Sequence, residues 1–427
     1  MIVQGHRTLG LIALAAALAS SAAWADFGSP VTLSPASSHA SGAEVVVDAD
    51  GDAFVVWEQL DGANASIQAR ARAAGGALGP IARISPVGRD AFDPKVAIDA
   101  EGDALVVWRR GSFKKGTPRI QARARSAAGE LGPIKTLSDP DQTSFGAEVA
   151  VDPDGRALVV WQIDDGTFDR IQARFRSASG ALGPIETLSP PGRNAYRPQV
   201  AIDADGDALV IWQGYDGMEE VQVQGRARSR PGRWGPVRTF SAGGVDLEPP
   251  EVAMESDGDA LVVWQADDGI QGRARSAGGG LGPLETFSKA GGRIPEVAID
   301  ADGDAVVVWR RSDGTNDLIY ARIRFANGDL GETENLSAAG RNADLPEVGV
   351  AADGDAVVVW ERFNGTINRV QARTLSAAGA LGPIETLSAA GGTAGLPQVA
   401  VNADGEAVAV WGRHDGAHFR VQAAVGP

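Results

Sequence analysis

The segment PEVAIDADGDAVVVW, residues 295–309, decides the fold, because closely similar segments recur along the whole chain. The nearest copies are PKVAIDAEGDALVVW (94–108), PQVAIDADGDALVIW (198–212) and PEVAMESDGDALVVW (250–264). With the more diverged copies, the repeat places a tryptophan every 45 to 53 residues, at Trp57, Trp108, Trp161, Trp212, Trp264, Trp309, Trp360 and Trp411. A fixed period of this length indicates an array of identical supersecondary units.

Each unit predicts four short strands. The first, such as Val96–Asp99, alternates apolar and polar residues, and the second, such as Ala104–Trp108, is a continuous apolar run typical of a strand buried on both faces. The third, such as Ile120–Arg125, has strict period two, and the fourth is the LGPIETLS type at 182–189. A proline inside a strand is tolerated at a sheet edge. The fourth strand is therefore predicted to be outermost, since six copies carry proline there, at Pro80, Pro133, Pro184, Pro236, Pro283 and Pro383.

The two ends of the chain predict that the array closes into a ring. The last copy stops after its third strand, residues 420–425, and the missing fourth segment lies at the other end, at residues 27–34. An open solenoid would have no reason to divide one unit between its ends, whereas closure removes the unpaired edges. We predict an all-β fold: an eight-bladed β-propeller of four-stranded antiparallel blades, closed by the N-terminal strand that completes the last blade.

The V-A-x-D-x-D-G hairpin and the closing strand resemble the secreted bacterial β-propeller repeat families, and more loosely the NHL and WD-repeat propellers. The resemblance covers residues 27–427 and implies the fold, but no particular activity, because such propellers host many functions. The phrase A-x-D-x-x-G…W is also similar to the tryptophan motifs of eight-bladed quinoprotein dehydrogenases. Their vicinal cysteine pair is absent and the spacing differs, so no cofactor is expected.

Residues 1–25 read as a signal peptide: a basic start with Arg7, an apolar run over 9–18, and the A-x-A site 23–25, with cleavage expected after Ala25. The alternative is a retained interfacial anchor. Residues 26–427 then form a single domain, secreted or periplasmic, with no membrane span. The chain has a net charge of -16 and no cysteine. This charge argues against nucleic acid as a partner, and disulfides cannot contribute to stability.

The repeated elements of the blade have structural interpretations. We expect the eight tryptophans to pack between blades. Asp48, Asp50 and Asp52 partly match a calcium loop, but the feature that all eight copies share is the glycine, which favours a tight hairpin turn over a metal site. We expect the recurrent third-strand arginines to pair with acids of the same or the next blade; they are Arg70, Arg123, Arg174, Arg226, Arg273, Arg322 and Arg373.

Candidate binding residues are those at which one copy departs from the others. The second copy replaces its Asp-Gly turn by a basic loop, 109–116, and the fourth copy brings aromatic and basic residues to the same face. An anion- or protein-binding patch is the functional hypothesis, with ordinary loop variation as the alternative. The candidate residues are Arg109, Arg110, Lys114, Lys115, Arg193, Tyr196, Arg197 and Tyr215.

No catalytic signature stands out. The histidine pair in H-D-G-A-H, residues 414–418, lacks the helical register and adjacent glutamate of zinc proteases. The sequence favours a secreted non-enzymatic binding or scaffold module whose partner is an unidentified protein or glycan. The alternatives are an extracellular polysaccharide hydrolase or lyase with acids in the central channel, and a calcium-stabilised surface protein. Carboxylates that converge with an aromatic residue at a channel mouth would favour the enzyme, and small apolar residues there would favour the scaffold.

Overall fold

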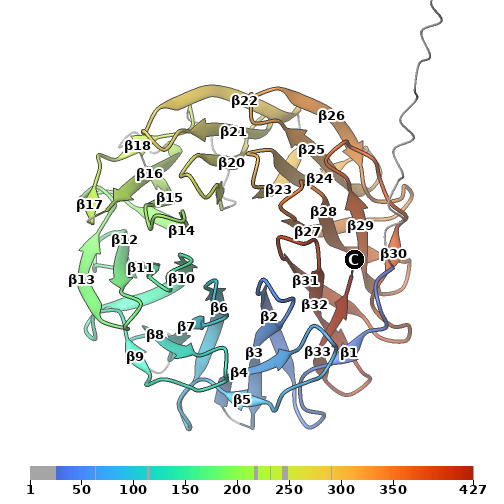
Figure 1. Cartoon of the computed structure of the whole chain (residues 1–427), viewed down its shortest axis with the longest axis horizontal. Coiled ribbons are helices and arrows are strands. Elements are labelled where there is room, and N and C mark those ends of the chain that lie inside the picture. Colours follow the sequence, from blue (N-terminus) through green and yellow to red (C-terminus); the bar gives the residue numbers. More distant parts are fainter. Residues whose placement is uncertain are drawn as a thin grey trace, which may run out of the picture.

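The computed structural model describes residues 26–426, except 63, 113–115, 216–219, 231, 243–248 and 290. The segment 1–25, for which a signal peptide is predicted, lies outside the described residues. Eight antiparallel sheets surround a common axis (Figure 1), as predicted for an eight-bladed β-propeller. The described part of the chain contains no helix long and apolar enough to cross a membrane.

Every blade orders its strands as predicted, from the axis outward. The inner strands are β2 (Ala40–Val47), β6 (Ala91–Ile98), β10 (Thr143–Val151), β14 (Ala195–Ile202), β19 (Glu251–Met254), β23 (Gly292–Ile299), β27 (Ala343–Val350) and β31 (Ala394–Val401). The second strands, which carry the tryptophans, are β3 (Ala53–Asp61), β7 (Ala104–Arg110), β11 (Ala157–Asp164), β15 (Ala208–Tyr215), β20 (Ala260–Ala266), β24 (Ala305–Ser312), β28 (Ala356–Phe363) and β32 (Ala407–His414).

The third strands are β4 (Asn64–Arg72), β8 (Arg119–Arg125), β12 (Asp169–Arg176), β16 (Val221–Ser229), β21 (Gly269–Arg275), β25 (Asp317–Arg324), β29 (Asn368–Leu375) and β33 (Phe419–Val425). The outer strands are β1 (Val31–Thr32), β5 (Ala82–Arg83), β9 (Lys135–Thr136), β13 (Leu182–Thr187), β17 (Arg233–Trp234) with β18 (Arg238–Thr239), β22 (Leu281–Lys289), β26 (Leu330–Asn335) and β30 (Glu385–Thr386). Blades are numbered 1 to 8 from β2, so blade 8 comprises β31, β32, β33 and β1.

The N-terminal strand closes the ring, as predicted. Strand β1 pairs with β33 through Val31 opposite Ala423 and Thr32 opposite Gln422. The contact continues at Leu33, whose N–H donates to the carbonyl oxygen of Val421 over 2.8 Å. Blade 8 therefore has the same four strands as the blades formed from continuous chain.

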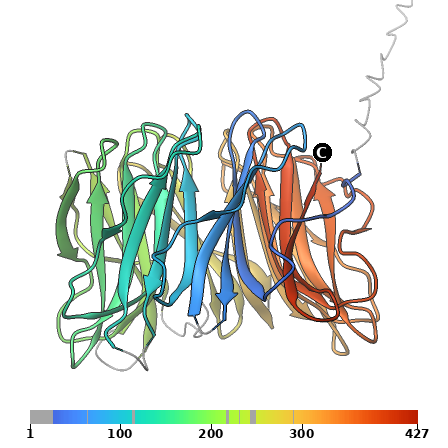
Figure 2. The ribbon, with the colours of Figure 1, turned by 90° about the horizontal axis from the view of Figure 1, so that it is seen from below.

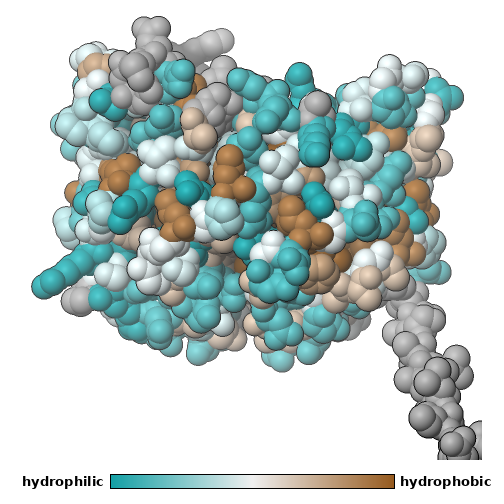
Figure 3. Space-filling view, turned by 90° about the horizontal axis from the view of Figure 1, so that it is seen from above, coloured by the Kyte–Doolittle hydropathy of each residue, from teal (hydrophilic) through white to brown (hydrophobic). Residues whose placement is uncertain are grey.

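The strands run from one face of the ring to the other (Figure 2), so the connections lie on two faces. The turn face carries the connections between first and second strands, such as residues 48–52. The loop face carries those between second and third strands, such as residues 165–168, and those that lead into the next inner strand, such as residues 84–90. On the side of the ring seen in Figure 3, hydrophilic residues predominate and hydrophobic residues form small separate groups.

The eight tryptophans hold neighbouring blades together, as predicted. All eight are fully buried. Trp161 of blade 3, for example, shares a core cluster with Leu105, Val107 and Ile120 of blade 2. Because each aromatic side chain removes roughly 150–250 Å² from water, these inter-blade contacts form the main hydrophobic core.

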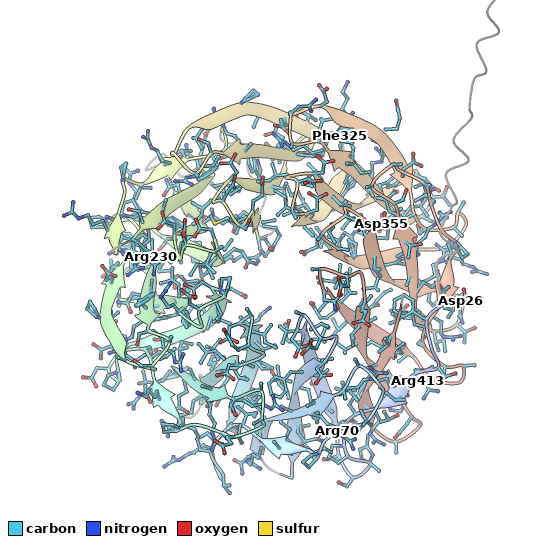
Figure 4. The ribbon with its side chains drawn as sticks, viewed as in Figure 1. Asp26, Arg70, Arg230, Phe325, Asp355 and Arg413 are labelled. Carbon is cyan, nitrogen blue, oxygen red and sulfur yellow. The ribbon has the colours of Figure 1, made fainter. Side chains whose placement is uncertain are left out.

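The prediction for the third-strand arginines is wrong, because they bind carbonyl oxygens instead of acids. Nε of Arg70, which Figure 4 labels in blade 1, donates to Gly79 in its own blade over 2.7 Å, and Nη1 donates to Leu33 of blade 8 over 3.2 Å. Arg174 repeats the pattern with Gly183 and Leu137. A guanidinium has several donors in a fixed fork, so one arginine can join the outer strands of two adjacent blades.

The acidic turn forms a hairpin and also packs against the next blade. In blade 6, Oδ1 of Asp300 accepts hydrogen bonds from the N–H groups of Asp302 and Asp304, both over 2.9 Å. Its Oδ2 lies 2.7 Å from the position that a Cβ atom on Gly354 of blade 7 would take, which is too close for a side chain there. Glycine is thus required at position 354 for two reasons: its φ is +86°, and the carboxylate of Asp300 leaves no room for a side chain.

This double requirement predicts that Gly354→Ala is more destabilising than a glycine substitution that costs backbone strain alone. Gly166 is the matched control, because its φ is +90° and no atom lies within 4 Å of its Cβ position. We expect Gly166→Ala to cost about 1–2 kcal/mol from the positive φ, and Gly354→Ala to cost about 1–3 kcal/mol more from overpacking. Urea denaturation of both variants tests this; equal losses would contradict the inter-blade role of the turn.

Candidate functional site

A basic pocket lies on the loop face between blades 1 and 2, and we call it the rim pocket. It has a volume of about 280 Å³, and three arginines line it together with one aspartate and short loop segments: Arg89, Asp90, Arg110 and Arg119, with Asn64, 88, 111, 112, 116 and 117. The connection from β5 to β6 supplies Arg89, whereas β7 and β8 supply Arg110 and Arg119. Three guanidinium groups around one pocket are unusual in a chain with a net charge of -16.

Arg119 departs from a structural pattern that other blades share. At its position, Nε of Arg170, Arg369 and Arg420 donates to a serine of the same blade's outer segment, over 3.1, 2.9 and 3.3 Å. In blade 2 the corresponding Ser138 accepts the N–H of Ile120 and, among the described residues, no bond from Arg119. Nε of Arg119 is buried and has no hydrogen-bond partner among the described residues. Arg119 therefore lacks the serine contact that fixes its counterparts, and its side chain lines the rim pocket.

Arg110 also differs from its counterparts. In blades 7 and 8, Arg362 and Arg413 occupy the same position and bind loop carbonyl oxygens, at Ala339 and Ala389, each over 3.1 Å. Arg110 lines the rim pocket instead. Partial burial lowers the pKa of Arg110, and the positive charges of Arg89 and Arg119 lower it further. An anion in the pocket would relieve this repulsion.

Arg109 is held within blade 2 and is not in the rim pocket. Its Nε donates to Oδ2 of Asp93 over 2.6 Å, Nη1 donates to the carbonyl oxygen of Gly111 over 2.9 Å, and the guanidinium lies 4.8 Å from the ring centre of Phe92. Lys114 and Lys115 lie outside the described residues. Of the two described basic residues of the predicted loop, Arg110 lines the pocket and Arg109 does not.

The predicted residues of blade 4 lie on the same face but form a separate group. Tyr196 and Tyr215 contact each other edge to face, with ring centres 6.1 Å apart. Arg193 and Arg197 are exposed, and Arg197 has a φ of +52° at the bulge of the inner strand. Blade 3 separates this group from the rim pocket, so the eight predicted residues do not form one site.

From the sequence, the loops near 88–92 and 109–119 were expected on the binding rim, but Arg89 and Arg119, the other two arginines of the rim pocket, were not named as candidate residues. Arg89 stands in the loop motif G-R-D-A, which resembles G-R-N-A in blades 4 and 7, and Arg119 matches the arginines of three other blades. The available signal was the combination of all three arginines in blade 2. Their convergence depends on how two loops approach each other in space, and this cannot be predicted by comparing the sequences of the repeats.

A ring of polar side chains surrounds the axis at one level of the inner strands, and we call it the channel ring. It comprises Glu44, Lys95, Glu148, Gln199, Glu251, Glu296, Glu347 and Gln398, the residues at one register in all eight blades. Figure 4 shows side chains of the inner strands around the axis of the ring. Sequence reasoning considered acids in the channel without naming these positions, although each copy carries a polar residue there.

Neighbouring members of the channel ring are in contact. Nζ of Lys95 lies 3.0 Å from a carboxylate oxygen of Glu44 and 3.6 Å from one of Glu148. Gln199 donates to Glu251 and Gln398 donates to Glu347, both over 2.9 Å. The side chains of Glu44 and Glu148 remain 22% and 23% exposed. Around the channel ring, Glu251, Glu296 and Glu347 of blades 5 to 7 are consecutive members, and no basic member of the ring stands between them.

Burial and mutual repulsion favour the protonated form of several glutamates in the channel ring. Burial raises the pKa of Glu251 and Glu347 to about 8, with further contributions from neighbouring carboxylates. Burial also raises the pKa of Glu296 well above its usual value and that of Glu148 to about 7. Glu148 and Glu44 hold the pKa of Lys95 above its usual range. The ammonium of Lys95 lowers the pKa of Glu148, but by less than burial raises it.

Beside the channel ring, the next channel-facing position carries small or aliphatic residues, Ala or Gly in seven blades and Val46 in blade 1. Aromatic residues occur on three of the inner strands toward the loop face, at Phe92, Phe145 and Tyr196. The inner strands therefore combine a level of mostly acidic residues with a level of small residues, and the rings of Phe92 and Tyr196 contact Arg109 and Tyr215 of their own blades.

The acidic turns use their carboxylates to bind backbone N–H groups. Oδ1 of Asp48 accepts from Asp50 and Asp52 over 3.1 and 2.9 Å, and Oδ1 of Asp52 accepts from Ala74 over 2.8 Å. Within the described ranges, no group of three or more histidines and acids is arranged to hold a metal ion. The geometry at these positions is that of a hairpin turn.

Comparison with known proteins extends the fold assignment. No protein-family model matches the chain, and no curated protein matches it in sequence. Among solved structures, the chain resembles the BP39L lectin from Burkholderia pseudomallei with a TM-score of 0.57 and 13% identity, over 84% of this chain and 100% of the lectin. It resembles the polysaccharide lyase Uly1 with a TM-score of 0.51 and 11% identity, over 94% of this chain and 99% of the lyase. At these identities the likeness establishes a shared β-propeller fold.

Proposed function

We propose that the protein is a non-enzymatic binding module that recognises carboxylate or sulfate groups of an acidic ligand in the rim pocket. The observation that carries the proposal is the convergence of Arg89, Arg110 and Arg119 on one pocket. Guanidinium groups bind such anions through paired, charge-assisted hydrogen bonds. Asp90 offsets one of the three positive charges, so an incoming anion meets a net positive pocket.

Acidic polysaccharides are the ligand class that we place first. The sequence predicts export, and polymers with repeated carboxylate or sulfate groups are common outside cells. The lectin and the polysaccharide lyase with the same fold both act on saccharides by their names, which supports this choice. Weak single-site binding would be strengthened along a polymer, because repeated groups raise the effective concentration at the pocket.

The test is binding of polygalacturonate and chondroitin sulfate to the protein, measured by calorimetry, with uncharged dextran as the control polymer. We expect binding of at least one acidic polymer, weakened by salt because exposed charges are screened. Arg110→Gln and Arg119→Gln should each weaken it by about tenfold or more, since a hydrogen bond to a charged group contributes about 1.5–3 kcal/mol. The matched control is Arg341→Gln, which stands in the G-R-N-A loop of blade 7 and should leave binding unchanged.

Two outcomes would overturn the proposal. Affinity that does not respond to the rim-pocket substitutions would place the ligand elsewhere. Shortening of the polymer by the protein, detected by size-exclusion chromatography, would overturn its non-enzymatic character. If Glu251→Gln abolishes that shortening, the channel ring supplies the chemistry and the protein is an enzyme, for which a carboxyl group with a raised pKa is a suitable general acid.

A further inference from the structure

A second pocket lies on the loop face at blade 8, where the two ends of the chain meet, and we call it the seam pocket. It has a volume of about 240 Å³. Blades 7, 8 and 1 all contribute to its lining. Blade 7 supplies Glu361 and Asn368, blade 8 supplies Gly395, Leu396, Gly412 and Phe419, and blade 1 supplies Gly42. It shares no residue with the rim pocket.

Beside the seam pocket, blade 8 lacks two side chains that other blades possess; the Glu361 carboxylate takes the place of one at Gly395, and the place at Gly412 is open. Gly395 and Gly412 are direct partners across β31 and β32. The same pair of positions is Phe92 with Arg109 in blade 2 and Tyr196 with Gln213 in blade 4. The floor of the pocket is therefore bare backbone at a place where the repeat normally puts large side chains.

The absence of a side chain at Gly412 also removes an inter-blade hydrogen bond. In other blades, the residue after the tryptophan accepts the N–H of the bulge residue in the next blade: Glu58 accepts from Asp93, Gln162 from Arg197 and Glu361 from Leu396, over 2.7, 3.3 and 2.8 Å. Gly412 has no such acceptor for Gly42, the bulge residue of blade 1, whose φ of +57° matches the others. Among the described residues, no side chain takes the place of this acceptor, so the N–H of Gly42 is open to an acceptor in the pocket.

The walls combine apolar surface with hydrogen-bonding groups. Phe419 and Leu396 are 39% and 58% exposed, which is high for large hydrophobic residues. On one wall, Oε1 of Glu361 accepts the N–H of Leu396 over 2.8 Å, and Oε2 accepts from Nδ2 of Asn368 over 2.7 Å. These bonds fix the carboxylate and leave further lone pairs for donors from a ligand.

We infer that the seam pocket binds one pyranose unit of a neutral sugar. A pyranose presents a C–H face that can cover the Phe419 ring, hydroxyl donors for Glu361, and oxygen acceptors for the Gly42 N–H. An anionic ligand is opposed by the carboxylate of Glu361, and a purely aliphatic ligand would cover these polar groups without satisfying them. A few placed polar groups within an otherwise apolar pocket are typical of small-molecule sites.

Gly412→Gln provides the sharpest test, because glutamine stands at this position in blades 3, 4 and 5. Its side chain should fill the floor and accept the Gly42 N–H, so that binding is lost while the melting temperature is unchanged or higher. The site for its Cβ is free, since the nearest atoms are 3.7 and 3.9 Å away. Phe419→Ala should weaken binding without filling the pocket.

The measurement is saturation-transfer NMR with a panel of methyl pyranosides of glucose, galactose, mannose and xylose. We expect transfer to at least one sugar from the wild type and from Arg110→Gln, and a loss of at least tenfold in Gly412→Gln. Absence of transfer to every sugar, or transfer that persists in Gly412→Gln, would overturn the inference. Preferential binding of tetramethylammonium would also overturn it, because the pocket would then recognise a cation. Retention of sugar binding by Arg110→Gln separates this site from the rim pocket.

Discussion

The protein should lose stability as the pH rises from 5 to 9, in contrast to proteins whose acids are salt-bridged. The pKa values of Glu251 and Glu347 are about 8 in the folded state, and an unfolded glutamate titrates near its ordinary value of 4.5. The folded protein therefore binds more protons than the unfolded chain between these values. The contribution of these two glutamates to the free energy of unfolding is fully present below about pH 4.5 and is lost as the pH rises through about 8. Because one pKa unit corresponds to about 1.4 kcal/mol, the total loss should be on the order of several kcal/mol.

Urea denaturation at pH 5, 7 and 9 measures this effect. Glu251→Gln removes one titrating group and retains an acceptor for Gln199, so it should flatten the pH dependence and stabilise the protein at pH 9. Glu130→Gln is the control, because Glu130 is exposed in a hairpin far from the channel ring and should leave the pH dependence unchanged. A denaturation midpoint that stays constant or rises between pH 5 and 9 would contradict the raised pKa values.

Leu33→Ala should destabilise the protein by about 2–5 kcal/mol, the usual cost of truncating a fully buried leucine. Leu33 follows the two-residue strand β1 and is completely buried, in a cluster with Trp57 of blade 1 and Val410 and Val421 of blade 8. Its carbonyl oxygen also accepts the bond from Arg70. The side chain therefore contributes to both blades at the closure of the ring.

The informative comparison is with Leu137→Ala, since Leu137 occupies the same position in blade 2, where the chain is continuous, and is equally buried. Equal losses of unfolding free energy are expected if the closing segment packs as firmly as a strand joined by a hairpin. Val31→Ala, at a side chain that is 39% exposed, should change stability by less than about 1 kcal/mol. A much smaller loss for Leu33→Ala than for Leu137→Ala would mean that the N-terminal segment is only loosely attached.

Several interactions could not be predicted from the repeat because they join residues of different blades or of separate loops. The third-strand arginines were expected to pair with acids, but the nearest acceptors in the assembled ring are the carbonyl oxygens of two outer strands, as for Arg174. His39 provides a second example. Its Nδ1 accepts the N–H of Phe419, and its ring lies 4.9 Å from that of His418, although 379 positions separate the two histidines in the sequence. Both contacts form only when the ring closes.

The sequence by itself determined the blades, their number and the closing strand. These follow from signals within one unit, the period-two strands, the turn glycines and the buried tryptophans, and from counting units along the chain. Only the tertiary structure decided what the blades build together: a channel ring with one residue from each blade, a rim pocket formed by two loops, and a seam pocket across blades 7, 8 and 1. The physical reason is that strand formation depends on local patterning, whereas charge repulsion, burial and unfilled space depend on which distant residues the closed ring brings within a few ångströms of one another.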